Sequence, residues 1–312
     1  MRYLGSPPSL RALLAAGYDV QAVVMPGPPG MTALPPLARS QPGRGDFVPL
    51  TVVSDDPLDE QIDEIAHAAG IPVLLAGSLR RPEVIAAIGG YRPDVIVVSC
   101  FTLRLPRALL ELPRFGCVNV HPSLLPRWRG VDPVFWTLRS GDQETGLTIH
   151  LMDEGFDTGP ILLQERTTVP EGIRQTDFER ELSERAGPLL VKALDGLIAG
   201  RIVPSPQDDR LATNAPEPVP EDYVVRTDRP GRWAYNFVRG VAPFDGPLLL
   251  DVVSTRERIP LRDAVSYSPD ERQENPVEWD GDRLSVQFTP GVVRFVADSS
   301  PLVTSTSSHH ND

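Results

Sequence analysis

The feature that most constrains the fold is an unbroken apolar run at 94–100, DVIVVSC. A half-exposed strand alternates apolar and polar residues, so a run without alternation indicates a strand covered on both faces. A second strand of this kind is predicted at 117–121. Helix-like segments flank and separate the two runs, at 59–69, 82–88, 106–112 and 133–139. Strands that alternate with helices predict an α/β unit with a mostly parallel sheet and helices on both sides.

Further elements are expected around this centre. Helices are predicted at 10–16, with Ser9 as N-cap, and at 176–198. Strands are predicted at 20–24, 47–53, 73–75, 147–152 and 161–168. Residues 25–46 are rich in proline and glycine and therefore indicate a loop.

A change of pattern after residue 200 indicates a second domain. Residues 201–222 are polar and rich in proline, as in a linker or a wrapping segment. A helix at 230–239 and short β runs at 247–253, 258–265, 283–288 and 292–296 then predict a smaller β-rich domain, an OB-like barrel. We therefore predict a catalytic domain at 1–203, a linker at 204–222, a β-rich domain at 223–298 and a disordered polar tail at 299–312.

Composition excludes several classes of protein. No run of eighteen apolar residues occurs, so a membrane span is not expected. The first residues lack a basic segment followed by an apolar one, so we expect a cytoplasmic protein. Cys100 and Cys117 lie in apolar runs and are expected to be buried free thiols. The net charge of −12 argues against a broad nonspecific surface for nucleic acid.

Polar side chains occur where the second buried strand ends. Asn119 and His121 are two residues apart and therefore project from the same face of the strand. In open α/β sheets, the carboxyl ends of the strands border the ligand-binding crevice. An amide donor beside an imidazole suits a reaction that passes through an oxyanion. Asp157 lies in an acidic loop after the 147–152 strand, where an aspartate is either a turn former or a catalytic carboxylate.

These two segments together resemble a known family. They contain Asn119-x-His121-Pro-Ser-Leu-Leu-Pro126, then Gly130, then Asp157-Thr-Gly-Pro160. This order resembles the 10-formyltetrahydrofolate-dependent formyltransferases, and the resemblance covers roughly residues 20–200. It implies a Rossmann-like formyltransferase domain that transfers a formyl group from 10-formyltetrahydrofolate to a primary amine without a metal. Residues 212–247 also look like the entry to the C-terminal domain of methionyl-tRNA formyltransferases, with Asn236 and Arg239 at matching places.

The resemblance also implies roles for individual residues. Asn119 and His121 would donate to the oxyanion, while Asp157 would hold His121 or a water and help to remove the amine proton. A neighbouring carboxylate is expected to raise the pKa of His121 and so keep an imidazolium available. The implied folate site comprises three segments, namely Phe101, Thr102, Leu103 and Leu105; Ser123, Leu124, Leu125 and Pro126; and Asp153, Glu154, Gly155 and Phe156.

Other interpretations of these residues remain open. A zinc site could combine His121, His150 and an aspartate, but the required spacing is absent and the family needs no metal. His150 lies inside a predicted strand and is expected to be a packed residue. Trp128 and Arg129 either line the entrance for the acceptor or shape the loop. A formyltetrahydrofolate hydrolase and an inactive folate-binding module are the alternative functions.

The acceptor is where the sequence indications disagree. The domain layout favours methionyl-tRNA, and on this ground we expect a methionyl-tRNA formyltransferase-like enzyme. Residues 203–312, however, hold eleven arginines, no lysine and eighteen carboxylates, a charge of −7 that favours an amino sugar or another small amine. The chain also departs from the family in three places. Its opening strand (1–4) is short, and the loop after the second strand has only Arg39 and Arg44 as basic residues. The sequence at 131–141 is unlike the Ala-Pro sequence that is usual in the tRNA enzymes.

Overall fold

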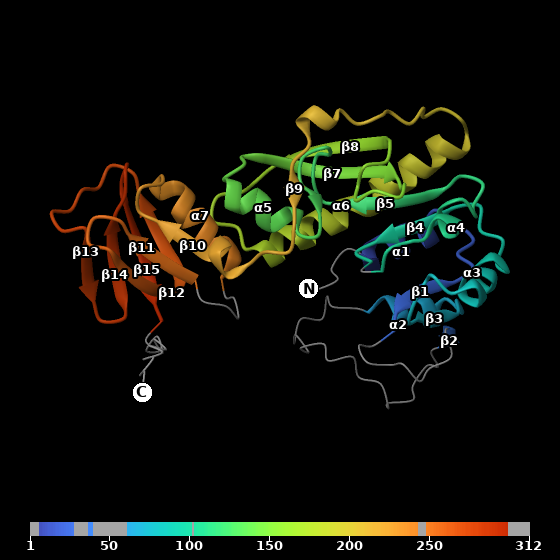
Figure 1. The fold of residues 1–312 in the computed structure, drawn as a ribbon, viewed down its shortest axis with the longest axis horizontal. Coiled ribbons are helices and arrows are strands. Elements are labelled where there is room, and N and C mark those ends of the chain that lie inside the picture. Colours follow the sequence, from blue (N-terminus) through green and yellow to red (C-terminus); the bar gives the residue numbers. More distant parts are fainter. Residues whose placement is uncertain (1–5, 28–36, 40–60, 102, 243–247, 299–312) are drawn as a thin grey trace, which may run out of the picture. The chain divides into compact units, whose positions relative to one another are not determined.

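The computed structural model describes residues 6–27, 37–39, 61–101, 103–242 and 248–298 (Figure 1). The chain divides into two compact units. Unit 1 comprises Met1–Val134, Glu144–Thr168 and Thr176–Pro216, and unit 2 comprises Phe135–Gln143, Val169–Gln175 and Glu217–Asp312. The two units interleave along the chain, whereas the sequence prediction divides it once, at 204–222. The predicted strand at 47–53, the opening strand at 1–4 and the tail at 299–312 lie outside the described residues.

The strands of unit 1 form two main sheets among its described residues. In the first, β1 (Val23–Pro26) pairs in parallel with β3 (Val73–Ala76), and β2 (Leu37–Arg39) joins β3 antiparallel. The second has the order β4-β5-β7-β8 and comprises Ile96–Ser99, Cys117–His121, Glu144–Leu151 and Ile161–Thr168. Within it β4 and β5 run parallel, while β7 and β8 are added antiparallel. The predicted α/β class is confirmed.

Burial in the second sheet explains where its end residues point. Strand β5 lies between β4 and β7, and four of its five residues are buried. In β4 only Val98 of the four residues is buried, so the prediction that this strand is covered on both faces is not confirmed. In strand β8 only Leu162 is buried, and from Leu163 on partly buried residues alternate with exposed ones, as expected at a sheet edge. The antiparallel register sets Asn119 of β5 opposite His150 of β7. The polar end of β5 therefore meets a second polar side chain on the neighbouring strand.

The helices of unit 1 pack on these sheets through apolar residues. They are α1 (Ser6–Ala15), α2 (Ile62–Ala68), α3 (Pro82–Gly89), α4 (Arg107–Leu110) and α6 (Gln175–Ile198). The predicted start of the first helix at Leu10 is wrong, because Pro7 and Pro8 fit the first turn, where a missing N–H has no cost. Gly187 of α6 allows α1 to approach closely, since a Cβ there would lie 2.7 Å from the Ala12 Cβ and 2.9 Å from the Pro8 carbonyl oxygen.

Unit 2 is a mostly antiparallel sheet packed on one helix. The sheet has the order β10-β11-β12-β15-β14-β13, comprising Val224–Arg226, Leu248–Val252, Glu257–Ser268, Val292–Ala297, Arg283–Gln287 and Val277–Asp280. Helix α7 (Gly231–Val241) buries Trp233, Phe237 and Val241 against it, and Phe135 of α5 (Pro133–Ser140) joins this core. The predicted β-rich C-terminal region is confirmed. The prediction missed β10 and β13, which are short and, at β13, largely exposed.

An ion pair between Arg174 and Asp263 stabilises the carboxyl end of α7 in unit 2. Arg174 donates to both Asp263 carboxylate oxygens, at 3.0 and 2.6 Å. Its Nη1 also donates to the carbonyl oxygens of Arg239 and Ala242, at 2.7 and 2.8 Å. One guanidinium thus joins a strand to the carboxyl end of a helix, where carbonyl groups lack partners within the helix and a cation is favoured.

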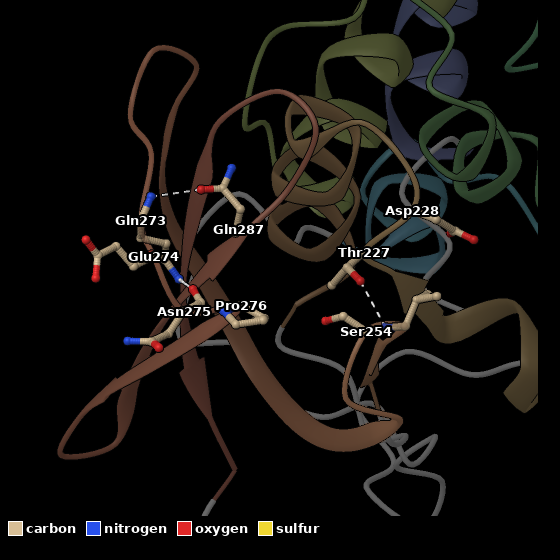
Figure 2. Close-up of a pocket in the computed structure, with 9 residues that line it drawn as sticks. Thr227, Asp228, Ser254, Gln273, Glu274, Asn275, Pro276 and Gln287 are labelled. Carbon is tan, nitrogen blue, oxygen red and sulfur yellow. Dashed lines mark hydrogen bonds between the residues drawn. The ribbon is translucent and has the colours of Figure 1, made fainter.

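A polar cavity of about 330 Å3 opens in unit 2 (Figure 2). It is lined by Thr227, Asp228, Val253, Ser254, Gln273, Glu274, Asn275, Pro276 and Gln287. Polar groups in the lining bond one another, as when the Gln273 N–H donates to Gln287 Oε1 at 2.9 Å. The lining contains no histidine, cysteine or lysine, and the Thr227 hydroxyl accepts the Val253 N–H at 3.1 Å.

None of the helices in the described part of the chain combines the length and apolar character that crossing a membrane requires.

Candidate active site

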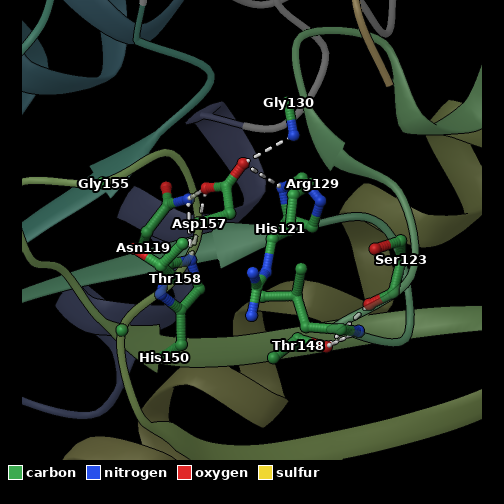
Figure 3. Close-up of polar contacts among 12 residues, drawn as sticks. Asn119, His121, Ser123, Arg129, Gly130, Thr148, His150, Gly155, Asp157 and Thr158 are labelled. Carbon is green, nitrogen blue, oxygen red and sulfur yellow. Dashed lines mark hydrogen bonds and ion pairs between the residues drawn. The ribbon is translucent and has the colours of Figure 1, made fainter. Parts of the chain in front are cut away.

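Asp157 lies at the centre of a buried polar cluster at the carboxyl end of β5 (Figure 3). Its Oδ2 accepts the Gly130 backbone N–H at 2.9 Å, and its Oδ1 accepts Asn119 Nδ2 at 3.2 Å. Its Oδ2 lies 3.6 Å from His121 Nδ1, and its Oδ1 lies 3.5 Å from His150 Nε2. The structure thus brings together the three predicted catalytic residues, Asn119, His121 and Asp157, and adds His150.

Backbone contacts determine which nitrogen of His121 faces this cluster. His121 Nε2 lies 2.8 Å from the Trp128 carbonyl oxygen. Because a carbonyl oxygen only accepts hydrogen bonds, this contact places the proton on Nε2. The other nitrogen, Nδ1, therefore faces the Asp157 carboxylate, and in the neutral ring it carries a lone pair.

His150 has the same kind of anchor. Its Nδ1 lies 2.8 Å from the Leu151 carbonyl oxygen, which places the proton there. Its Nε2 then accepts from Asn119 Nδ2 at 3.2 Å. The Asn119 amide therefore uses its two N–H groups on His150 and Asp157, and its orientation is set by both. His150 is 1% exposed, so it is packed as predicted, and it is also part of the polar cluster.

Burial and charge act in opposite directions on the two central groups. Burial lowers the pKa of His121 more than the nearby Asp157 carboxylate raises it, since the ring is only 4% exposed. The carboxylate does raise this pKa, as expected, but burial has the larger effect, so the expected imidazolium is not favoured. Burial acts to raise the pKa of Asp157, but His121, His150 and the Gly130 amide outweigh it and hold that pKa well below its usual range. Near neutral pH the cluster thus combines a neutral imidazole with a carboxylate.

Backbone conformation at Gly130 and Asp157 fits this contact. Asp157 has a φ of 53° and Gly130 a φ of 128°. A Cβ on Gly130 would lie 2.6 Å from the Ala215 carbonyl oxygen, because β6 (Arg129–Gly130) pairs with β9 (Asn214–Ala215). Glycine is therefore required where the chain delivers an N–H to the carboxylate.

A network of buried hydrogen bonds fixes the conformation of the predicted folate loop at 123–126. Ser123 is fully buried and donates to the Arg127 carbonyl oxygen at 2.6 Å. Thr148 Oγ1 donates to the Ser123 carbonyl at 2.7 Å and accepts the Leu125 N–H at 3.1 Å. Gln164 Nε2 donates to the Leu125 carbonyl at 2.8 Å. The side chains of Ser123 and Leu125 thus face the protein interior and shape this loop.

The other two predicted folate segments contact each other. Arg104 donates to the Glu154 carbonyl oxygen, and its guanidinium lies 5.5 Å from the centre of the Phe156 ring. Asp153 Oδ1 accepts the Gly155 N–H at 2.9 Å and the Thr158 hydroxyl at 2.6 Å, which closes a tight turn. Phe156 is 66% exposed beside this turn. In the 101–105 segment Phe101 and Leu103 are partly buried and Leu105 is buried, while Thr102 lies outside the described residues.

The loop that carries Trp128 and Arg129 is anchored by its backbone and by one guanidinium. The Trp128 N–H donates to Thr213 Oγ1 at 2.9 Å. The Arg129 side chain is only 9% exposed and bonds Gln207 and Asp209. Of the two interpretations left open by the sequence, the structure supports loop shaping for Arg129.

The prediction for the cysteines holds for only one of them. Cys117 is buried in β5, but Cys100 is exposed just after β4, where its φ of 50° takes it out of the strand. Within the described ranges, no three histidine, cysteine, aspartate or glutamate side chains are grouped so as to hold a metal ion.

Two contributions to this site were not predicted from the sequence. His150 was expected to be a packed residue, although alternation along β7 and the pairing of β7 with β5 place it beside Asn119. Gln207 had no predicted role, and its Nε2 donates to the carbonyl oxygens of Asp157 at 2.8 Å and Gly159 at 2.7 Å. No local pattern marks this residue, because its contacts are 50 and 48 positions away in sequence.

Comparisons with known proteins identify the family that this chain resembles. Residues 52–194 match the family model described as formyl transferase. A methionyl-tRNA formyltransferase from Citrifermentans bemidjiense is 38% identical over 252 residues, which cover 78% of this chain and 72% of that protein. Another, from Pelobacter propionicus, is 37% identical over 249 residues, with the same coverage of 78% and 72%.

A solved structure extends the likeness to the fold of nearly the whole chain. It is an N-formyltransferase from Helicobacter canadensis in complex with folinic acid and dTDP-3-aminofucose. The TM-score is 0.60 over 93% of this chain and 94% of that chain, and at 14% identity the likeness concerns the fold alone. Since the relatives at 37–38% identity cover most of both sequences, this chain belongs to the formyltransferase family and is a formyl-transferring enzyme similar to the methionyl-tRNA formyltransferases.

Proposed function

We propose that the chain transfers the formyl group of 10-formyltetrahydrofolate to the amine of methionyl-tRNA. The observation that carries this proposal is the 38% identity to a methionyl-tRNA formyltransferase over 78% of this chain. A match of that length has to continue past Pro216, the last residue of unit 1, into unit 2. The similarity therefore includes residues outside the catalytic unit, where recognition of a large acceptor would be located.

The reaction requires a site for an oxyanion and an acceptor for a proton. The lone pair of the amine attacks the formyl carbon, and the carbonyl electron pair moves to oxygen. The resulting intermediate collapses by breaking the bond from the formyl carbon to N10, which releases tetrahydrofolate. The amine loses one proton during this sequence and N10 gains one.

The cluster offers one group for each requirement. Asn119 Nδ2 supplies the donor to the oxyanion, exchanging one of its bonds to Asp157 or His150 for a bond to substrate. His121 is neutral near pH 7 and its Nδ1 accepts the amine proton, which it then delivers to N10. The Asp157 carboxylate, 3.6 Å from that nitrogen, stabilises the imidazolium formed on the way. Losing one oxyanion donor typically lowers the rate by about 10²–10³-fold.

We assign the folate to the three predicted segments. The Arg104 contacts hold the 101–105 segment against the 153–156 turn. The partly buried Phe101 and Leu103 offer an apolar wall, and the exposed Phe156 ring is placed to cover a flat ring system. The apolar lining with backbone groups at a turn fits a pterin, which needs both stacking and edge hydrogen bonds.

Charge favours a second candidate acceptor, a small amine such as an amino sugar. Residues 203–312 have eleven arginines and eighteen carboxylates, and phosphate contacts require clustered cations. The two candidates differ in their dependence on salt, because only a polyanionic acceptor releases bound counterions when it binds.

A release assay distinguishes the functions. Purified protein is incubated with 10-formyltetrahydrofolate and initiator Met-tRNA, and tetrahydrofolate is measured, with a parallel titration of tRNA binding at low and high salt. We expect release that depends on the tRNA and is lost in His121→Ala. Release with an amino sugar and no binding of tRNA at low salt would exclude the tRNA acceptor. Release at an equal rate without any amine would identify a hydrolase instead.

A further inference from the structure

A segment from the end of unit 1 returns to the loop that carries Asp157. We call residues 205–215 the return segment. Ser205 exchanges two backbone hydrogen bonds with Ile161, at 2.8 and 2.9 Å. At the other end, Thr213 accepts the Arg129 N–H at 2.9 Å and donates to the Pro126 carbonyl at 3.2 Å. The return segment is therefore fixed both to the strand that follows the Asp157 loop and to the loop that follows β5.

Gln207 joins these two loops through its side chain. Its Nε2 donates to the carbonyl oxygens of Asp157 and Gly159, at 2.8 and 2.7 Å. Its Oε1 accepts from Arg129 Nε and Nη2, at 3.0 and 2.8 Å. A carboxamide has two N–H donors and one oxygen with two lone pairs, so these four bonds use its full capacity. The Gln207 side chain thus has one orientation that satisfies every partner.

The backbone that Gln207 binds needs external support. Asp157 has a φ of 53°, in the left-handed region that residues other than glycine seldom adopt. Such conformations persist when surrounding bonds over-determine them. Here the bonds from Gln207 meet the carbonyl of Asp157 itself, while the Gly130 N–H meets its carboxylate. Gly130 directly follows Arg129, the other partner of Gln207. The Gln207 side chain therefore supports both the carbonyl contact and the carboxylate contact of Asp157, and we call its bonds to Arg129, Asp157 and Gly159 the bridge.

We propose that Gln207 is a positioning residue for formyl transfer, which acts with Arg129 to hold the Asp157 carboxylate beside His121. This inference rests on the catalytic roles proposed above for His121 and Asp157. Displacing a catalytic group by about 1 Å can lower a rate by about 10²-fold. Loss of the bridge should therefore lower kcat and leave the affinity for folate nearly unchanged.

Two substitutions separate the halves of the bridge. Gln207→Leu removes all four hydrogen bonds. Gln207→Glu retains oxygen acceptors for Arg129 but replaces both donors by an oxygen that faces two carbonyl groups. Arg210→Ala is the matched control from the same segment, because Arg210 is 88% exposed and its guanidinium bonds Asp208 rather than Arg129 or Gln207.

The readouts are kcat and KM for 10-formyltetrahydrofolate, the thermal midpoint, and the titration of the His121 ring followed by NMR. We expect kcat to fall about 10–100-fold in both Gln207 variants, with KM changed less than about threefold and the control within about twofold of wild type. We also expect the His121 titration to move to lower pH, because a displaced carboxylate no longer favours the imidazolium.

The ring titration separates this inference from the proposed function. An unchanged His121 titration in a folded Gln207 variant overturns the positioning role, whatever the rate. Full kcat in Gln207→Glu overturns it as well, since that variant lacks both donors. If Gln207→Leu fails to fold, Gln207→Glu provides the answer at nearly equal size. Should methionyl-tRNA not be the acceptor, kcat is lost as a readout while the titration still tests the bridge.

Discussion

Replacement of Asp157 by asparagine tests the proton-transfer mechanism most directly. The asparagine keeps the size of the side chain but removes the negative charge 3.6 Å from His121 Nδ1. At an effective dielectric constant of about 20, a charge pair at that distance interacts by about 5 kcal/mol. Because the imidazolium forms only during the reaction, this interaction is lost in the transition state, and kcat should fall about 10³-fold. The substitution also replaces one carboxylate oxygen by an NH2 group. This new donor faces either the Gly130 N–H or the Asn119 amide, which are donors themselves, and the mismatch lowers the free energy of unfolding by about 1.5–3 kcal/mol.

The assay follows tetrahydrofolate release at saturating acceptor, with the free energy of unfolding measured in urea on the same preparations. Asp177→Asn is a suitable control, since Asp177 is an exposed carboxylate that pairs with Arg180, three positions along α6. The mechanism predicts a loss in kcat, little change in KM for the folate and an inert control. A folded Asp157→Asn enzyme within tenfold of wild-type kcat would refute the idea that this carboxylate supports a charged His121.

Three further predictions concern the structure around the site. Gly130→Ala should lower both stability and kcat, because its Cβ would lie 2.6 Å from the Ala215 carbonyl oxygen. A thermal melt followed by circular dichroism and the release assay measure the two effects, and a melting temperature equal to that of the wild type would contradict the prediction. Arg174→Ala should destabilise unit 2 by about 2–4 kcal/mol in urea unfolding, because it leaves Asp263 and two helix-end carbonyls without this donor. Stability should decrease as the pH falls below about 6.5, because burial lowers the pKa of His121 and the unfolded chain then binds more protons than the folded one. The depressed pKa of Asp157 adds a further loss at still lower pH, as the carboxylate is protonated, and a melting temperature that is constant from pH 7.5 to 5 would contradict the buried neutral ring.

Apolar runs in the sequence predicted the positions of strands better than their burial. The unalternated run at 94–100 marked β4, but β4 ends the order β4-β5-β7-β8 and only Val98 of its four residues is buried. The change to short β runs marked the C-terminal sheet. The short strands β10 and β13 escaped prediction, because three or four residues with little burial carry almost no periodic signal. Cys100 was misplaced for a related reason: it ends an apolar run, but a left-handed backbone turns it out to solvent.

The site was predictable to the extent that its residues share a strand end or a motif. Asn119 and His121 follow from strand alternation, and Asp157 from its motif in the acidic loop. His150 required the antiparallel pairing of β5 with β7, and Gln207 required the path of the return segment. Both depend on long-range pairing, which composition and local spacing do not encode.

Burial is the quantity that changes the chemistry assigned to His121. From the sequence alone, a carboxylate near a histidine argues for an imidazolium that donates to the oxyanion. In the folded protein the ring is 4% exposed and its Nε2 proton is committed to the Trp128 carbonyl. The ring is therefore neutral in the resting enzyme, and Nδ1 is the nitrogen that can accept a proton beside Asp157. The same two residues thus favour proton removal from the amine as the first task of His121, which leaves stabilisation of the oxyanion to Asn119.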